Sequence, residues 1–398
     1  MKKIMNFFIP IAIPIIIAVF ATVALNSFLD NKIETLTKEK DISAMGKMRF
    51  DTIKDKSSLD KKLLSNKGDL FLLGSSELGI SVPQNALAFF PFEGVDYNLS
   101  CFGRPFTQDL QQATYLGGGD IKDNQKVAFI LSIQWFEDAN GLTPDHFVSN
   151  FSEVQFYNFL KNPKISEENK RYYVQRVYDF LTKANKNQPE AYYAKLYLDS
   201  STFSKVQKIL LKPYYEIKQY LLSIQDKALI YKELKKLPNK NAGQPLRTVN
   251  WNDEYAKVEK DNEKIVSTNQ FNLKDSLYNQ TLRDNIDKHK GESKNEDLMV
   301  SKEMDDYKFF LSVCKDLNIQ PYIIMPPVNG WYYDYEGLPK DKREEWDKKV
   351  NEIAKDSGFD VLDLSSYDYK KYFLVDKEHL GEEGWLRVSE GIYKHFNK

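Results

Sequence analysis

The chain has 398 residues, of which 42% are hydrophobic and 28% are charged, and its formal net charge is −1. This composition is typical of a globular protein with one large domain or two to three smaller ones, and the balanced charge leads us to expect no nucleic-acid partner. The two cysteines, Cys101 and Cys314, exclude a disulfide framework and a four-cysteine zinc site. The sequence contains no metal-binding or nucleotide-binding motif, so we expect neither a metal ion nor another cofactor.

The N-terminal segment 4–26 has Asn6 as its one strongly polar residue before Asn26 and is long enough to cross a bilayer as a helix. It is longer than the apolar region of most secretory signal peptides, and no convincing cleavage site follows it. Lys2 and Lys3 favour a cytoplasmic N-terminus, which would place the rest of the chain outside the cell. We therefore expect a single-pass anchor in the cell membrane, with a cleaved signal peptide as the alternative.

Residues 27–65 are polar and rich in lysine, and we interpret them as a juxtamembrane stalk that is partly helical. Short apolar runs follow, with the continuous Val, Ile and Leu content of strands that are covered on both faces. Such strands belong to parallel sheets. The predicted strands lie within residues 70–74, 96–101, 127–136, 321–327 and 360–365.

Helical patterns connect the later strands, at residues 306–318, 340–358 and 382–396. Another helical stretch contains the patterns 166–185, 189–200 and 204–237 and is followed by a loop at 238–248. Strands that alternate with helices indicate an α/β fold. We predict a three-layer α/β/α domain with a parallel sheet, built from residues 66–140 and 300–398 and interrupted by a helical insertion at 141–299.

Two adjacent serines, Ser75 and Ser76, follow the first predicted strand and Gly74. In open α/β sheets, binding sites form at the carboxyl edge of the strands, which is where this turn would lie. A serine hydroxyl there becomes a nucleophile when a neighbouring base accepts its proton. The alternative is that the serines only cap the helix that follows.

Asp376 and His379 lie between the last predicted strand and the last predicted helix, in the stretch FLVDKEHLGEEGW. An aspartate that accepts a hydrogen bond from one imidazole nitrogen leaves the other nitrogen free to accept a serine proton. The alternative is an ordinary loop in which Asp376 caps a turn. The sequence thus contains a candidate triad in which Asp376 and His379 act on one of the two serines, Ser75 or Ser76.

A serine after the first strand and Asp-x-x-His after the last strand resemble the chain order of the SGNH (GDSL-type) hydrolase and acyltransferase superfamily. The stretches NLSCFGRPFTQ and LSIQWF resemble its second and third blocks. The resemblance implies an oxyanion hole that includes Gly103 and Gln134. The resemblance implies that Ser76 is the nucleophile of a Ser76–His379–Asp376 triad. Ser75 and Gln134 replace the aspartate and asparagine that the superfamily has at those positions.

With the N-terminal anchor, the stretches GSSEL, QWF, NGWYYDY and DKEHLGEEGW are similar to those of the DltD family, which acts in D-alanylation of teichoic acids. The resemblance implies a membrane partner, the O-acyltransferase DltB, and lipoteichoic acid as the acceptor. We expect four further side chains to line an acceptor groove, with simple packing as the alternative: Trp135, Asn329, Trp331 and Tyr332.

These features lead us to expect a serine-dependent enzyme that transfers D-alanyl groups to lipoteichoic acid outside the cell membrane. One alternative is a surface esterase or O-acetyltransferase that acts on another cell-wall glycopolymer. The other alternative is a non-catalytic binding subunit of the D-alanylation machinery.

Overall fold

The computed structural model describes residues 2–240 and 245–397, so residues 241–244 of the expected loop lie outside the described residues. Five parallel strands form one sheet in the order β2-β1-β3-β4-β5, which confirms the predicted fold class. Each strand overlaps one of the predicted apolar runs. The strands are β1 (Leu70–Leu73), β2 (Leu99–Phe102), β3 (Val127–Ile130), β4 (Pro321–Met325) and β5 (Val361–Asp363).

The side chains of the central strands point alternately to two separate hydrophobic cores, because successive residues of a strand face opposite sides of the sheet. Phe71 and Leu73 lie in one core, and Leu70 and Leu72 lie in the other. The first core is covered by α6 (Asp109–Gly117), α14 (Glu303–Asp316) and α16 (Lys340–Asp356). The second is covered by α5 (Ala86–Phe89), α12 (Trp251–Asn262) and α17 (Glu382–Phe396). The sheet is therefore the middle of three layers.

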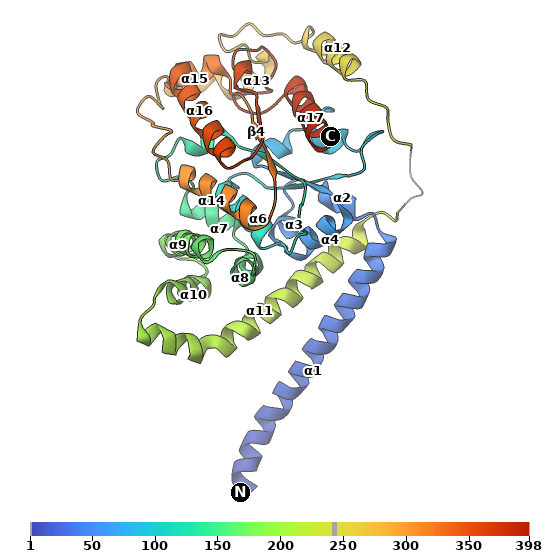
Figure 1. The fold of residues 1–398 in the computed structure, drawn as a ribbon, viewed down its shortest axis with the longest axis vertical. Helices are drawn as coiled ribbons and strands as arrows, with labels where there is room; N and C mark the ends of the chain where they lie inside the picture. The colour runs from blue at the N-terminus through green and yellow to red at the C-terminus, as the bar shows by residue number, and fades with distance from the viewer. Residues whose placement is uncertain (1, 241–244, 398) are drawn as a thin grey trace.

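The helical stretch after β3 is divided between the two ends of the molecule (Figure 1). Five of its helices extend the first core, namely α7 (Pro144–Asn150), α8 (Glu153–Lys161), α9 (Glu167–Ala184), α10 (Gln188–Leu198) and α11 (Thr202–Lys236). The later helices α12 and α13 (Asp275–Thr281) lie near α17 and α15 (Gly330–Glu336), at the end opposite the N-terminus. The expected insertion at 141–299 thus contributes to both faces of the sheet rather than forming one separate lobe.

The chain begins with one long helix, α1 (Lys2–Glu39), which projects from the rest of the protein (Figure 1). Its segment Ile13–Glu39 has a mean hydropathy of 1.9 over the most apolar window and is long and apolar enough to cross a membrane. The last part of α1 packs against α11, where Phe28 contacts Tyr231 and Asp30 pairs with Lys227 at 2.6 Å.

The segment after α1 belongs to the residues 27–65 that we interpreted as a partly helical juxtamembrane stalk. Helices α2 (Ile42–Gly46), α3 (Thr52–Lys56) and α4 (Leu59–Lys67) pack onto the α/β domain. Lys54 and Asp55 are buried there as an ion pair at 2.6 Å, and buried Lys61 donates hydrogen bonds to backbone carbonyls. A charge-rich sequence looks solvated, but charges that are paired and hydrogen-bonded can be buried.

Candidate active site

Ser76 begins the short 3₁₀ helix η1 (Ser76–Gly79), three residues after the last residue of β1. Its neighbours Ser75 and Glu77 are buried, whereas Ser76 itself is partly exposed. The Oγ of Ser76 lies 3.0 Å from Nε2 of His379. The turn therefore directs one of the two adjacent serines toward an imidazole that is 303 positions away in the chain.

His379 belongs to a tight loop that closes on itself before α17. The backbone N–H of Val375 donates to the carbonyl of His379 at 2.8 Å, and Oδ1 of Asp376 accepts the backbone N–H groups of Glu378 and His379. The other carboxylate oxygen, Oδ2, lies 2.7 Å from Nδ1 of His379. One oxygen of Asp376 thus holds the loop and the other orients the imidazole.

The electrostatics of this pair match its geometry. Burial alone would lower the pKa of His379, but the hydrogen bond and the negative charge of Asp376 outweigh it and raise that pKa above its ordinary value. Burial likewise opposes the charge of Asp376, yet the His379 hydrogen bond leaves the pKa of Asp376 lowered. Asp376 therefore stays ionised, accepts a hydrogen bond from Nδ1–H and leaves the Nε2 lone pair of neutral His379 toward Ser76.

Gly103 follows β2 at the same edge of the sheet, in a conformation that requires glycine. Its φ is +137°, and a Cβ atom there would lie 1.8 Å from the carbonyl oxygen of Gly74. The Gly74 carbonyl also accepts a hydrogen bond of 2.5 Å from the side chain of Gln112. Only a residue without a side chain can bring the backbone of the β2 turn this close to the Ser76 turn.

Three groups that could bind an oxyanion are without partners within the described parts of the chain: the backbone N–H groups of Ser76 and Gly103 and the side-chain amide of Gln134. Gln134 lies in the 3₁₀ helix η2 (Ile133–Phe136), directly after β3, and is partly exposed. The residues that carry these groups follow β1, β2 and β3, which are neighbours in the sheet. Unpaired donors at one sheet edge are what stabilisation of a developing negative charge requires.

Glu77 stabilises the turn that contains Ser76 through a buried hydrogen bond. Its Oε1 accepts the backbone N–H of Ser75 at 2.7 Å, and the whole side chain is buried. Burial raises the pKa of Glu77 to about 7. Ser75 has its own partner, because its hydroxyl donates to the carbonyl of Arg104 at 3.1 Å. Ser75 thus joins the β1 turn to the β2 turn and does not face His379.

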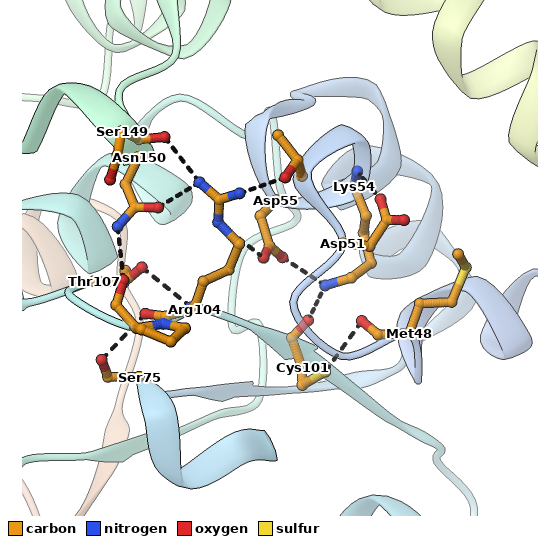
Figure 2. Close-up of polar contacts among 12 residues, drawn as sticks. Met48, Asp51, Lys54, Asp55, Ser75, Cys101, Arg104, Thr107, Ser149 and Asn150 are labelled. Atoms are coloured by element: carbon orange, nitrogen blue, oxygen red, sulfur yellow. Dashed lines mark hydrogen bonds and ion pairs between the residues drawn. The ribbon is translucent and has the colours of Figure 1, made fainter. Parts of the chain in front are cut away.

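Arg104 lies at the centre of a polar network next to this turn (Figure 2). Its guanidinium donates to the carbonyl of Ser149 at 2.9 Å and contacts the side chains of Asn150 and Thr52. It also faces buried Asp55 of α3. The network fixes the residue that follows Gly103. Sequence reasoning missed it, because its members come from distant segments and none carries a motif.

The four side chains expected to line an acceptor groove have other surroundings. Trp135 is 4% exposed and packs against Phe129, and Tyr332 is 1% exposed. Asn329 uses both ends of its amide, because Oδ1 caps α15 at the N–H of Tyr332 and Nδ2 donates to the carbonyl of Phe271. Trp331 is half-buried, edge-on to Tyr369. In contrast to the expectation, Trp135, Asn329 and Tyr332 therefore have packing and capping surroundings, and Trp331 alone stays partly open.

Among the described residues, one group of three side chains is placed so that it could hold a metal ion: His289, Glu292 and Glu336. His289 is already paired with Glu292 at 2.8 Å, and Glu336 accepts a hydrogen bond from Tyr332. The group contains no member of the Ser76–His379–Asp376 arrangement. The geometry of that arrangement suits proton transfer and covalent catalysis.

Comparison with known proteins gives a consistent result. Residues 48–397 match the family model described as DltD protein. Protein DltD of Bacillus subtilis is 28% identical over 394 residues, which cover 98% of this chain and 97% of that protein. Protein DltD of Staphylococcus aureus is 26% identical over 369 residues, which cover 90% of this chain and 89% of that protein. The chain belongs to the DltD family.

Proposed function

We propose that this protein transfers D-alanyl groups to lipoteichoic acid outside the cell membrane, with Ser76 as the nucleophile. DltD-family proteins are involved in teichoic acid D-alanylation. The observation that carries the proposal is the continuous contact from Ser76 Oγ to His379 Nε2, at 3.0 Å, and from His379 Nδ1 to Asp376 Oδ2, at 2.7 Å. The same three residue types in the same contacts are a general solution for acyl transfer.

In the first half-reaction, Ser76 Oγ attacks the carbonyl carbon of a D-alanyl ester while its proton passes to Nε2 of His379. The negative oxygen of the tetrahedral intermediate would accept hydrogen bonds from the N–H groups of Ser76 and Gly103 and from the Gln134 amide. The intermediate collapses, the bond to the donor alcohol breaks, and His379 returns the proton to that alcohol. The product of this step is D-alanyl-Ser76.

In the second half-reaction, a hydroxyl of the teichoic acid loses its proton to His379 and attacks the same carbonyl carbon. The bond to Ser76 breaks, and the proton returns to its Oγ. The D-alanyl ester then belongs to the polymer and the enzyme is regenerated. Asp376 stays ionised throughout and stabilises the imidazolium that forms twice in the cycle.

The membrane setting follows from α1, whose apolar segment would anchor the domain with its N-terminus in the cytoplasm. We propose that the donor alanine reaches Ser76 through the membrane O-acyltransferase DltB. An anchored enzyme and a membrane-embedded partner share one surface, which raises the effective concentration of the donor without any further contact.

The test compares two adjacent serines in the full-length protein. A fluorophosphonate probe should form a covalent adduct on Ser76 in the wild-type protein and in Ser75→Ala, and none in Ser76→Ala. Cells that produce Ser76→Ala as their sole copy should lose surface D-alanine, whereas thermal unfolding of the variant should be close to that of the wild type.

Unchanged surface D-alanine in folded Ser76→Ala would remove Ser76 from the mechanism and would favour a non-catalytic binding subunit. An adduct on Ser76 with no change in surface D-alanine would instead indicate an esterase that acts on another polymer.

A further inference from the structure

The N-terminal part of α11, from Phe203 to Leu221, carries a row of exposed apolar side chains. Phe203, Ile209 and Leu210 are each 72% exposed and Ile217 is 61% exposed. The row repeats every three or four residues, which places its members on one face of the helix. Its members are Phe203, Val206, Leu210, Tyr214, Ile217 and Leu221, flanked by Ile209 and Tyr220. We call this row the α11 face.

The α11 face continues a surface that α1 already covers. The same three- and four-residue spacing leads from Leu221 to Ile224, Ala228 and Tyr231. Ile224 is buried and Tyr231 packs on Phe28 of α1. One side of α11 is therefore covered by the anchor helix near its C-terminal end and uncovered along the rest of its length.

The two helices separate at the level where the apolar part of α1 ends. Lys227 of α11 pairs with Asp30 and hydrogen-bonds Asn26, which directly follows the apolar stretch. From this point the N-terminal part of α11 diverges from α1 while running toward the same end of the molecule (Figure 1). In that view, α11 is the element of the globular part that lies nearest the apolar half of α1.

We propose that the α11 face lies in the outer leaflet of the bilayer that α1 spans, as a second, interfacial membrane contact. The uncovered row spans about 27 Å along the helix axis, since a helix rises 1.5 Å per residue. Large apolar side chains on one face of a helix at the water–lipid boundary are typical of helices that lie in the interface.

The charges beside the row favour lipid over a protein as the occupant. Between Phe203 and Leu221 the helix carries four lysines but one acidic residue, Glu216. Lys218 pairs with Glu190 of the domain, which leaves Lys205, Lys208 and Lys212 beside the row. Lysine side chains at the border of an apolar row can extend their ammonium groups to anionic headgroups while the row enters the acyl region. The row also includes Tyr214 and Tyr220, a residue type enriched at membrane interfaces.

A second contact would set the orientation of the catalytic domain. A single helix anchor lets a domain tilt and rotate relative to the membrane, whereas a second contact restricts both motions. The α15 helix starts beyond the carboxyl end of β4 and lies at the end of the molecule opposite the N-terminus (Figure 1). With α11 on the lipid, the orientation of the sheet edge that carries Ser76 would be fixed relative to the membrane plane.

The experiment places one fluorophore on the α11 face and one at the opposite end of the full-length protein. Leu210→Cys is labelled with the environment-sensitive dye NBD, and Val266→Cys is the matched control, because Val266 is 66% exposed in the segment between α12 and α13. The native Cys101 and Cys314 are buried and should not react. Both proteins are reconstituted into vesicles of equal parts phosphatidylglycerol and phosphatidylcholine, with and without doxyl-labelled lipid.

The proposal expects blue-shifted emission at position 210 and quenching by doxyl lipid several-fold stronger than at position 266. Ile217→Cys should behave as Leu210→Cys does, which guards against a local labelling fault. Lys205→Gln with Lys212→Gln should weaken the quenching at position 210 in phosphatidylglycerol vesicles, and the same change at Lys232 and Lys235 should not.

Full access of aqueous iodide to position 210, with no doxyl quenching, would overturn the proposal. So would a label that is wet in pure lipid vesicles and becomes protected only in native membranes, because that result would assign the α11 face to a protein partner.

Discussion

The carboxyl edge of the sheet and the α1–α11 side of the molecule use their side chains in opposite ways. At the sheet edge, short turns after β1, β2 and β3 hold polar groups so firmly that a single methyl group at Gly103 would collide with Gly74. Along α11, large apolar side chains stand on one helix face with nothing described against them except where α1 passes. Both regions depart from the rule that polar groups face water and apolar groups face the core.

The difference teaches what each kind of function requires. Acyl transfer needs a few hydrogen-bond donors and one base at fixed positions, so the backbone around them is held by several contacts at once. Contact with a fluid bilayer needs apolar area and flanking positive charge but no fixed partner geometry. Substitutions at the sheet edge should therefore have large effects on rate, and substitutions on the α11 face should have little effect on the hydrolysis of a small soluble ester.

The largest effect should come from Asp376→Asn. An amide cannot hold the Nδ1 proton in the same way, so the rate of acyl transfer should fall on the order of 10⁴-fold. The measurement is kcat/KM for a soluble D-alanyl ester. Leu210→Ser is the control from the α11 face and should retain the wild-type value. A fall of less than about tenfold in Asp376→Asn would argue that His379 does not act as the base.

The same pair predicts the pH dependence. His379 must be neutral to accept the Ser76 proton, and its pKa is raised above 6.5. Activity should therefore fall as the pH drops through that raised pKa, at a higher pH than an ordinary histidine would give. In Asp376→Asn the fall of the residual activity on the acid side should shift to a lower pH. Burial then lowers the pKa of His379 without the opposing effect of the carboxylate.

A smaller loss is expected from Gln134→Ala. Removal of one oxyanion donor typically costs about 10²- to 10³-fold in kcat. Gln134→Asn, which restores the residue type of the superfamily pattern, is the control and should recover part of the rate. If Gln134→Ala kept the full rate, the oxyanion hole would consist of the two backbone N–H groups alone.

Glu77→Gln tests how the Ser76 turn is held. The pKa of Glu77 is raised to about 7 from 4.5, so its contribution to stability is present at acidic pH and is lost as the pH rises through about 7. Replacement by glutamine keeps the acceptor for the Ser75 N–H and removes the ionisation. As the pH rises from acidic to neutral, the wild type should lose on the order of 3 kcal/mol of its free energy of unfolding through Glu77, and the variant should not lose this contribution. Denaturant unfolding at both pH values measures this, and identical pH profiles would contradict it.

The smallest expected effect on rate is that of Arg104→Ala. Arg104 touches no reacting atom and acts by fixing the turn that presents Gly103, so kcat should fall about 10- to 100-fold with KM little changed. Arg104→Lys keeps the charge but lacks the planar fork and should be intermediate. An unchanged kcat in Arg104→Ala would show that the β2 turn needs no support from α3 and α7.

Much of the fold follows from local patterns. The five strands lie within or overlap short apolar runs, and α17 follows from the spacing of Trp385, Val388 and Ile392, which face the second core. The positions of Ser76, Asp376 and His379 in loops after strands also follow from the sequence, because parallel strands end at a common edge. These features depend on the spacing of residues that are close in the sequence, so they can be predicted without knowledge of tertiary contacts.

Other features depend on which segments meet. Residue chemistry does not distinguish Ser75 from Ser76, and only the resemblance to the superfamily pattern selects Ser76. In the structure the Ser75 hydroxyl donates to the carbonyl of Arg104 and the Ser76 hydroxyl lies against His379, and both partners are far away in the chain. The burial of Lys54 and Asp55 depends on their pairing with each other and on the sheet beside them.

By itself, then, the sequence determined three features: the succession of strands and helices along the chain, the apolar N-terminal helix and the residue types of the candidate triad. These depend on periodicity and turn chemistry over a few residues. The tertiary structure alone decided how Ser76 meets the imidazole, which charges are buried and which face of α11 stays uncovered. These depend on long-range packing, where the free energy of burying a group is set by partners that sequence spacing does not specify.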